Sequence, residues 1–331
     1  MGKFLESEKP KQAQFKTDSQ YFSDLARSEG VYRKKLRPFC IPRKFAEQNL
    51  VPEIRDSALS HFAEHSIKWH DGQNAKPSNH LCDSQVCCVN FLFPFADKPD
   101  SLAVLLQPYF PTIQKILPIE SGKYVTFEWI GDRDYLGEKA HSSNKKRSRG
   151  ANCTSADAMV RFERLDGKIQ IVLIEWKYTE SYGGTFLKKS TSGRDRTKIY
   201  KPLFDNLDCP INEDILPSFD SLFYEPFYQF IRQQLLANEM EKAHESGADL
   251  VSVLHIAPTH NNDFRRVTSP QLVTLGDSAT AVWKKLVRTK ERFLSISTEL
   301  LFGSLIEKNM PEMGEWLKYI SMRYPWIREN Q

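Results

Sequence analysis

Three ionisable side chains, Asp157, Glu175 and Lys177, are spaced so that they could act together at the end of a β-hairpin. Glu175 and Lys177 follow an apolar run, and side chains two residues apart on a strand point to the same face. Placing both groups there is costly unless they are paired, hydrated or metal-bound. Two neighbouring carboxylates stay ionised when a hard cation such as Mg²⁺ bridges them. Such a cation can activate water, and a lysine can neutralise the negative charge that develops.

The turn of this hairpin decides whether Asp157 joins Glu175. If residues 165–167 form a three-residue loop with Gly167 left-handed, Asp157 lies opposite Glu175 on the same side of the sheet. A two-residue Asp-Gly turn places Asp157 opposite Trp176 instead, and this slip of one residue sends its side chain to the other face. Both loop types are common, so the sequence leaves both registers open.

The surrounding pattern indicates a mixed α/β sheet flanked by helices. The order of a strand, a hairpin strand, a helix and a strand, with further helices before and after, favours one α/β domain over residues 51–331 that ends in a helical part. Residues 1–50 are polar and basic and are expected to form an extended, poorly packed arm. Helices are expected near 56–69, 82–93, 222–245 and over most of 278–320, and strands near 124–129, 156–164, 168–178 and 250–257.

Composition limits the class of protein. The 331 residues include 46 basic and 42 acidic ones, a net charge of +4 that excludes a histone-like polycation but allows a local basic groove. The sequence contains no apolar run of roughly 18 residues and no apolar signal peptide, so no membrane span is expected and the protein is expected in the cytoplasm. The six cysteines form no CxxC pair, and Cys82, Cys87 and Cys88 are expected to be buried free thiols.

A second motif could also bind a metal. His61, Glu64 and His65 match the pattern H-x-x-E-H, in which two histidines one helical turn apart hold zinc and the glutamate acts as a base. Such a zinc peptidase needs a further acidic ligand, and nothing in the sequence singles one out. A solvated or core-edge helix face is the favoured explanation of the motif. Because oxygen ligands favour hard cations and the cysteines lack zinc spacing, the protein is expected to bind Mg²⁺ or Mn²⁺ weakly and to hold no stoichiometric zinc.

Clusters of cations could line a groove for a polyanion. Basic loops at 141–150 and 188–201 bracket the hairpin, and a binder of nucleic acid needs such cations near phosphates. Arg265-Arg266 and the Lys284, Lys285 and Arg288 face could extend the groove, or these charges could be ordinary solvated surface. Gln229 and Arg232, on the helix that follows the hairpin, could support the site.

Several segments together resemble a known family. Ala156-Asp157 and Glu175-Trp176-Lys177 resemble the signature of the PD-(D/E)XK nuclease superfamily, with alanine in place of the usual proline. The wider resemblance, over roughly residues 55–260, is to a restriction-endonuclease-like family of mostly uncharacterised bacterial proteins. It rests on Trp69-His70, Ser84-Gln85 through Asn90, Tyr135-Leu136-Gly137-Glu138, Gly150-Ala151-Asn152, Thr154-Ser155-Ala156-Asp157, Glu175 through Tyr182, and Phe227-Tyr228-Gln229.

The resemblance implies a mixed four-stranded sheet flanked by helices and cleavage of DNA phosphodiester bonds that depends on Mg²⁺ or Mn²⁺. It implies Asp157 and Glu175 as metal ligands and Lys177 as the catalytic cation. Members often add an upstream acidic residue, for which Glu64, Glu128 and Glu138 are candidates, and Glu138 is the preferred metal ligand. Two alternatives remain: a zinc peptidase built on His61, Glu64 and His65, and an inactive member that binds DNA or a partner. A homodimeric assembly is left open.

Overall fold

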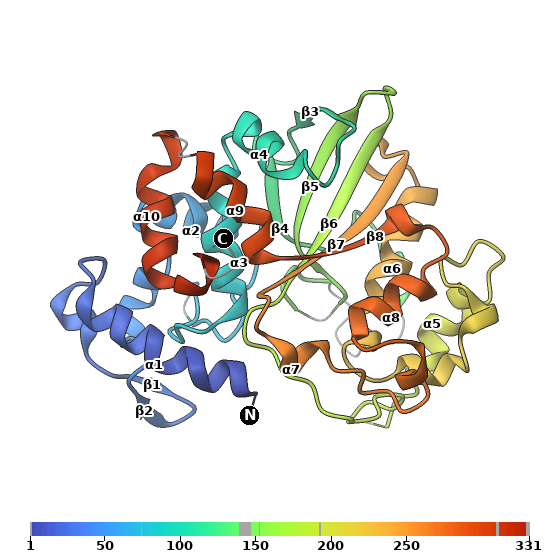
Figure 1. Ribbon diagram of the computed structural model, residues 1–331, viewed down its shortest axis with the longest axis horizontal. Coiled ribbons are helices and arrows are strands. Elements are labelled where there is room, and N and C mark those ends of the chain that lie inside the picture. The colour runs from blue at the N-terminus through green and yellow to red at the C-terminus, as the bar shows by residue number, and fades with distance from the viewer. Residues whose placement is uncertain are drawn as a thin grey trace.

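A mixed sheet of six strands forms the centre of the protein (Figure 1). The computed structural model describes residues 2–73, 75–138, 147–151, 153–191, 193–308 and 311–328. The strand order is β3-β5-β6-β7-β8, and β4 pairs with the part of β5 that β3 leaves uncovered. The mixed α/β architecture that the sequence predicts is therefore present, but the sheet has six strands and not four. The strands are β3 (Ile113–Leu117), β4 (Val125–Trp129), β5 (Ala156–Arg164), β6 (Ile169–Trp176), β7 (Leu250–Ala257) and β8 (Phe293–Ser297).

The central strands are apolar because both of their faces are covered. β6 runs antiparallel to β5 and parallel to β7, and strands buried on both faces lose the usual alternation of polar and apolar residues. Along β6, Val172 and Ile174 belong to one hydrophobic core, whereas Ile171 and Leu173 belong to the other. The sheet therefore separates two cores, and each is closed by its own layer of helices.

The helices divide between these two layers, which lie to the left and right of the sheet in Figure 1. One layer consists of α1 (Lys3–Asp18), α2 (Arg55–Glu64), α3 (Ser84–Leu92), α4 (Pro99–Leu106), α9 (Thr298–Lys308) and α10 (Gly314–Arg323). The other consists of α5 (Thr197–Phe204), α6 (Phe227–Lys242) and α8 (Ala279–Leu286). The short helix α7 (Asn262–Arg265) follows β7, and β1 (Gly30–Tyr32) and β2 (Lys35–Arg37) form a separate hairpin.

The first 50 residues differ from the extended arm that the sequence predicts. They begin with the 16-residue helix α1, whose Phe4 and Phe15 are buried in the first core. Glu8 of α1 is also buried and accepts hydrogen bonds from Tyr178, which follows β6, and from Trp326 near the C-terminus. The helix was missed because its few apolar residues are widely spaced among charged ones. Its burial depends on partners from the middle and from the C-terminal part of the chain.

Two boundaries also differ from the sequence prediction. The helix expected at 56–69 ends at Glu64, and Ser66 has a left-handed backbone with φ of 52°. The region 278–320, expected to be helical, includes strand β8, which pairs in parallel with β7. β8 lies between two helices, where the helical pattern dominates, and its pairing partner β7 is distant in the sequence, so it gives little local signal.

The cysteines and the helices agree with two further expectations. All six cysteines are free, and Cys82, Cys87 and Cys88 are buried as predicted. Among the described residues, the helices are too short or too polar to cross a membrane.

Candidate active site at the end of the central hairpin

The β5–β6 hairpin adopts the register that brings Asp157 opposite Glu175. Ala158 pairs with Ile174, and the pairing continues in step to Glu163 and Ile169. The turn has three residues, because the amide of Arg164 donates to the carbonyl of Lys168 at 2.8 Å and Gly167 is left-handed with φ of 76°. Only the first of the two registers that the sequence allows is therefore present.

A row of polar residues crosses the sheet at this level. Glu175 pairs with His255 on β7, and His255 pairs with Ser295 on β8. On the other side, Glu128 of β4 stands between residues paired with Ala156 and Ala158, which places it beside Asp157. Glu128, Glu175 and His255 of this row are buried, and burying such groups costs free energy unless they are paired. The row therefore identifies one level of the sheet as a candidate site.

The Asp157 carboxyl group lies in an environment that opposes its ionisation. It is half-buried, and one oxygen accepts a hydrogen bond from the backbone amide of Trp176 at 2.7 Å. Burial and, next, the negative charge of Glu175 raise the pKa of Asp157 well above its usual range, although Lys177 acts in the opposite direction. A carboxyl group with these neighbours is stabilised as an anion when a cation binds beside it.

Glu175 and Lys177 form a buried ion pair at the end of β6. Their exposed fractions are 1% and 4%, and the Lys177 ammonium group contacts one oxygen of Glu175. The side-chain amide of Gln233 on α6 donates to the other Glu175 oxygen. Burial disfavours the charged form of Lys177, but the negative charges around it, first that of Glu175, raise its pKa well above the usual value. Lys177 is therefore a fixed cation beside the carboxylates.

Of the three upstream glutamates, Glu128 is the one that lies beside Asp157 in the sheet. It is fully buried and left-handed, with φ of 51°. Its two oxygens accept hydrogen bonds from Gln85 and Ser155, each at 2.7 Å, and His70 Nε2 lies 3.4 Å away. The charge of Glu128 also contributes to the raised pKa of Asp157. A strained, buried and hydrogen-bonded carboxylate at the edge of a site is typical of a functional group.

The other two upstream candidates lie elsewhere. Glu138 accepts hydrogen bonds from the amide and hydroxyl groups of Thr154, at 2.7 and 2.6 Å, and from Tyr200 at 2.8 Å. These contacts fasten the segment that leads into β5, so Glu138 supports Asp157 through the backbone. Glu64 is on α2, where its side chain is mostly exposed and bonds to Ser121.

Two further polar residues of the site were not identified from the sequence. Gln233 lies four residues after Gln229 on the same face of α6, so helical periodicity could have identified it. Gln229 and Arg232, which the sequence suggested, instead contact Tyr182 and Tyr228 respectively. His255 had no sequence signal, because it lies in the middle of an apolar strand.

His255 is fully buried and has the properties of a neutral imidazole. Burial, and then the positive charge of Lys177, lower its pKa well below the usual value. Its Nδ1 lies 3.4 Å from the Ser295 hydroxyl, and Nε2 makes no hydrogen bond with any described residue. The ring stacks on Phe264 and meets the edge of Phe230. His255 therefore separates the charged end of β6 from the apolar packing beyond it.

The donor atoms of this site suit a hard cation. Asp157, Glu175 and Glu128 offer carboxylate oxygens only, which Mg²⁺ and Mn²⁺ prefer. In the described ranges, however, only His61, His65 and Glu120 place three candidate ligand atoms within 4.8 Å of one another. Mg²⁺ commonly keeps several waters and takes only one or two protein carboxylates, so a pair such as Asp157 and Glu175 is sufficient.

The basic loops divide into structural and exposed cations. Residues 139–146, most of the first loop, lie outside the described residues. Arg147 and Arg149 of that loop turn inward, to the carbonyl of Gly131 and to Glu120. Six of the remaining predicted cations contact groups of the fold, although Lys201, Lys285 and Arg288 among them are exposed: Lys188 contacts Asp220, Arg196 Leu187, Lys201 Asp205, Arg265 Pro258, Lys285 Leu275 and Arg288 Ile211. Lys189, Arg194, Lys198, Arg266 and Lys284 have exposed side chains.

Comparison with known families adds one match. A family described as "Restriction Endonuclease associating with ARP" matches residues 3–325, which is nearly the whole chain. Comparisons with curated proteins and with solved structures gave no match. The matched region includes α1, the complete sheet and both helical layers. With a mixed α/β sheet and acidic residues gathered at the end of its central hairpin, the chain belongs to this family of restriction endonucleases.

Proposed function

We propose that the protein is a divalent-metal-dependent endonuclease that hydrolyses phosphodiester bonds of DNA. The observation that supports this most directly is the register of the β5–β6 hairpin, which brings Asp157 opposite Glu175 with Lys177 two residues further on. Membership of a restriction endonuclease family makes a nucleic acid the expected substrate.

Asp157 and Glu175 are the residues that would hold Mg²⁺ or Mn²⁺. The raised pKa of Asp157 supports this role, because burial and then the charge of Glu175 oppose its ionisation and a bound cation would offset both. When bound, the metal supplies a water of lowered pKa and positive charge beside the scissile phosphate.

The protein's own groups account for the remaining requirements of the reaction. Lys177 keeps its proton and provides positive charge where negative charge develops on the phosphate oxygens. Gln233 orients Glu175 from α6, and Gln85 and Ser155 orient Glu128 from α3 and from the start of β5. These contacts hold the carboxylates in place before substrate arrives. In this proposal Glu128 replaces Glu138 as the third acidic residue.

The cations of the loop after β6 fit the binding of a phosphate backbone. The chain leaves β6 immediately before Lys177 and continues to Lys189, Arg194 and Lys198, all of which are exposed. Such side chains contribute to affinity without reading sequence. The tightly paired arginines, such as Arg149, are assigned to the fold and not to DNA.

The test is cleavage of supercoiled plasmid with Mg²⁺ or Mn²⁺ by the full chain and by Asp157→Asn and Glu175→Gln. Cleavage that requires the metal and is lost in both variants is the expected result. Asp249→Asn is the matched control, because the Asp249 carboxylate accepts a hydrogen bond from the amide of Ile169 at 2.9 Å, as Asp157 does from Trp176, but is exposed at the other end of β6.

Binding measured with Ca²⁺ in place of Mg²⁺ completes the test. If the variants bind DNA as the parent does but do not cleave it, the substitutions impair the chemical step and not DNA binding. If the parent binds DNA and cleaves neither plasmid nor single strands with either metal, the protein is an inactive binding member of the family and the proposal fails.

A further inference from the structure

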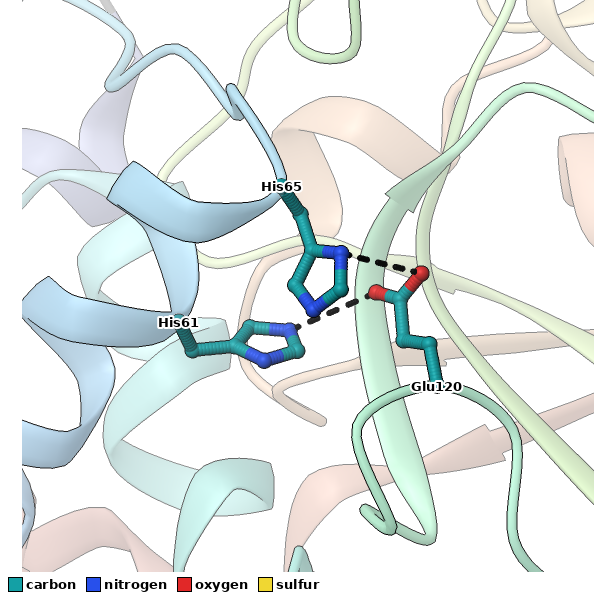
Figure 2. Close-up of side chains that lie close together, drawn as sticks. All are labelled: His61, His65 and Glu120. Atoms are coloured by element: carbon teal, nitrogen blue, oxygen red, sulfur yellow. Dashed lines mark ion pairs between the residues drawn. The ribbon is translucent and has the colours of Figure 1, made fainter.

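A second group of polar side chains lies where α2 meets the connection between β3 and β4. Figure 2 shows His61 and His65, one turn apart near the end of α2, both directed toward Glu120. His61 Nε2 is 3.5 Å from one oxygen of Glu120, and His65 Nδ1 is 3.6 Å from the other. The potential ligand atoms of the three residues all lie within 4.8 Å of one another.

His61 is buried without a hydrogen-bonding partner. Its exposed fraction is 3%, and neither ring nitrogen makes a hydrogen bond with any described residue. A buried imidazole without partners is costly, because both nitrogens lose their contacts with water. The side chain nevertheless points at a carboxylate and at the ring of His65, whose centroid is 4.6 Å away.

The separations of the two imidazoles from Glu120 are longer than direct hydrogen bonds and close to those between two ligands of one tetrahedral ion. Separations of 3.5 and 3.6 Å are long for an N–H···O bond. Two ligands bound to Zn²⁺ at about 2.0–2.1 Å in a tetrahedral arrangement lie about 3.4 Å apart. Imidazole nitrogen with one carboxylate oxygen is a donor set that favours zinc over Mg²⁺.

Glu120 is supported in a way that leaves it able to bind a metal. Arg149 Nη1 donates to both of its oxygens, at 2.9 and 3.0 Å, and Thr126 also donates to one of them. An ionised carboxylate has about four acceptor sites, so these contacts do not exhaust it. Hydrogen bonds of this kind orient ligating carboxylates in metal sites.

We propose that His61, His65 and Glu120 bind one zinc ion, with water in the fourth position, and that the ion fastens α2 to the connection before β4. The sequence analysis predicted no stoichiometric zinc, and it found no further acidic ligand for the two histidines. Glu120 supplies that ligand from a distant part of the chain. Glu64, the proposed base of the peptidase alternative, accepts a hydrogen bond from Ser121 and lies 3.8 Å from His65 Nε2, on the side of the ring away from Nδ1.

The site is separate from the carboxylates of the nuclease proposal and does not depend on that proposal. The two regions are joined only indirectly, because Arg149 also donates to the backbone carbonyls of Phe127 and Glu128. The binding experiment therefore uses the Asp157→Asn chain, in which the carboxylate site is weakened, and it measures no cleavage.

The experiment titrates Zn²⁺ into untagged, chelator-treated protein by calorimetry and Co²⁺ by visible absorption. One ion per chain is expected, with the strong visible bands of tetrahedral Co²⁺ and a rise of about 3 °C or more in the midpoint of thermal unfolding with excess Zn²⁺. His65→Gln and Glu120→Gln should each weaken binding by at least about tenfold. His65 is only partly buried, which makes its variant the less disruptive of the two.

His244→Asn is the matched control for a general effect of losing a histidine. His244 lies after α6, in a left-handed conformation that asparagine also adopts, and its Nδ1 is 3.2 Å from the carbonyl of Ala248. Unchanged zinc binding by this variant is expected. If the Asp157→Asn chain binds no zinc at about 100 μM, or if the folded chain that also carries His65→Gln binds zinc equally well, the cluster is only a buried network around Arg149 and the proposal is wrong.

Discussion

The two ends of the β5–β6 hairpin carry similar residues in opposite environments. At the turn, Asp166 is exposed and pairs with Arg164 at 3.2 Å, and the hydrogen bond from Arg164 lowers the pKa of Asp166. At the other end, Asp157 is half-buried beside Glu175, and burial raises its pKa. Asp166-Gly167-Lys168 and Glu175-Trp176-Lys177 are also the only Asp-x-Lys and Glu-x-Lys sequences in the chain.

The difference shows why a charged pattern alone does not identify a site. Water solvates the charges at the turn, where they help to end one strand and begin the next. At the far end, burial and the charge of Glu175 disfavour the ionised form of Asp157, and an ion pair is buried beside it. Such local costs are usually retained where function requires them.

The largest expected contrast is between the two lysines of this hairpin. Lys177→Met should reduce the rate of plasmid cleavage by about 10²–10³, the usual effect of losing one electrostatic donor from an active site. Lys168→Met, at the exposed end, should leave the rate unchanged. The measurement is single-turnover cleavage with Mg²⁺, with filter binding in Ca²⁺ to show that both variants still bind DNA.

Circular dichroism controls for the removal of one partner of a buried pair. A folded Lys177→Met chain that cleaves at the parental rate would make Lys177 structural and remove the contrast. If that chain unfolds while Asp157→Asn remains folded and inactive, the carboxylates keep their role and Lys177 is assigned to the fold.

A smaller effect is expected from the upstream glutamates. Glu128→Gln should lower the cleavage rate by about 10–100-fold, the usual cost of altering a group that supports a metal site. Glu138→Gln should cost less, because Glu138 bonds to Thr154 and Tyr200. Rates measured across a series of Mg²⁺ concentrations give the test. A larger loss in Glu138→Gln would restore the residue that the sequence favoured.

The smallest expected effect is on stability, and it has opposite signs at the two ends. Because the pKa of Asp157 is raised in the folded protein, the unfolded chain releases the Asp157 proton at a lower pH than the folded protein does. The contribution of Asp157 to the free energy of unfolding therefore falls as the pH rises above about 4. Without divalent metal, the change in stability caused by Asp157→Asn should therefore be more favourable at pH 8 than at pH 4. Asp166 has a lowered pKa, so Asp166→Asn should destabilise it slightly at pH 8 and less at pH 3.

Midpoints of thermal unfolding, measured in a chelating buffer at these pH values, give the sign of the stability change for each substitution. Addition of Mg²⁺ should then stabilise the parent more than Asp157→Asn, because only the parent has both carboxylates. Equal pH dependence for the two variants would show that the two ends of the hairpin do not differ electrostatically.

Much of the central sheet could be predicted from local pattern. β5, β6 and β7 lie within about a residue or two of their predicted limits, since long apolar runs and an Asp-Gly turn are strong local signals. α1 and β8 were missed for the opposite reason. A charged helix with a few widely spaced aromatic residues, and a strand of five residues, acquire their structure from distant partners.

The sequence by itself determined which residues could do the chemistry, because Asp157, Glu175 and Lys177 are distinguished by their types, their spacing and the apolar run beside them. The tertiary structure decided what surrounds them. The hairpin register was open locally because two turns were acceptable, and it was settled by the pairing of six strands between two cores. Glu128, Gln233, His255 and Glu120 lie on other elements, and their contacts with these sites depend on how those elements pack.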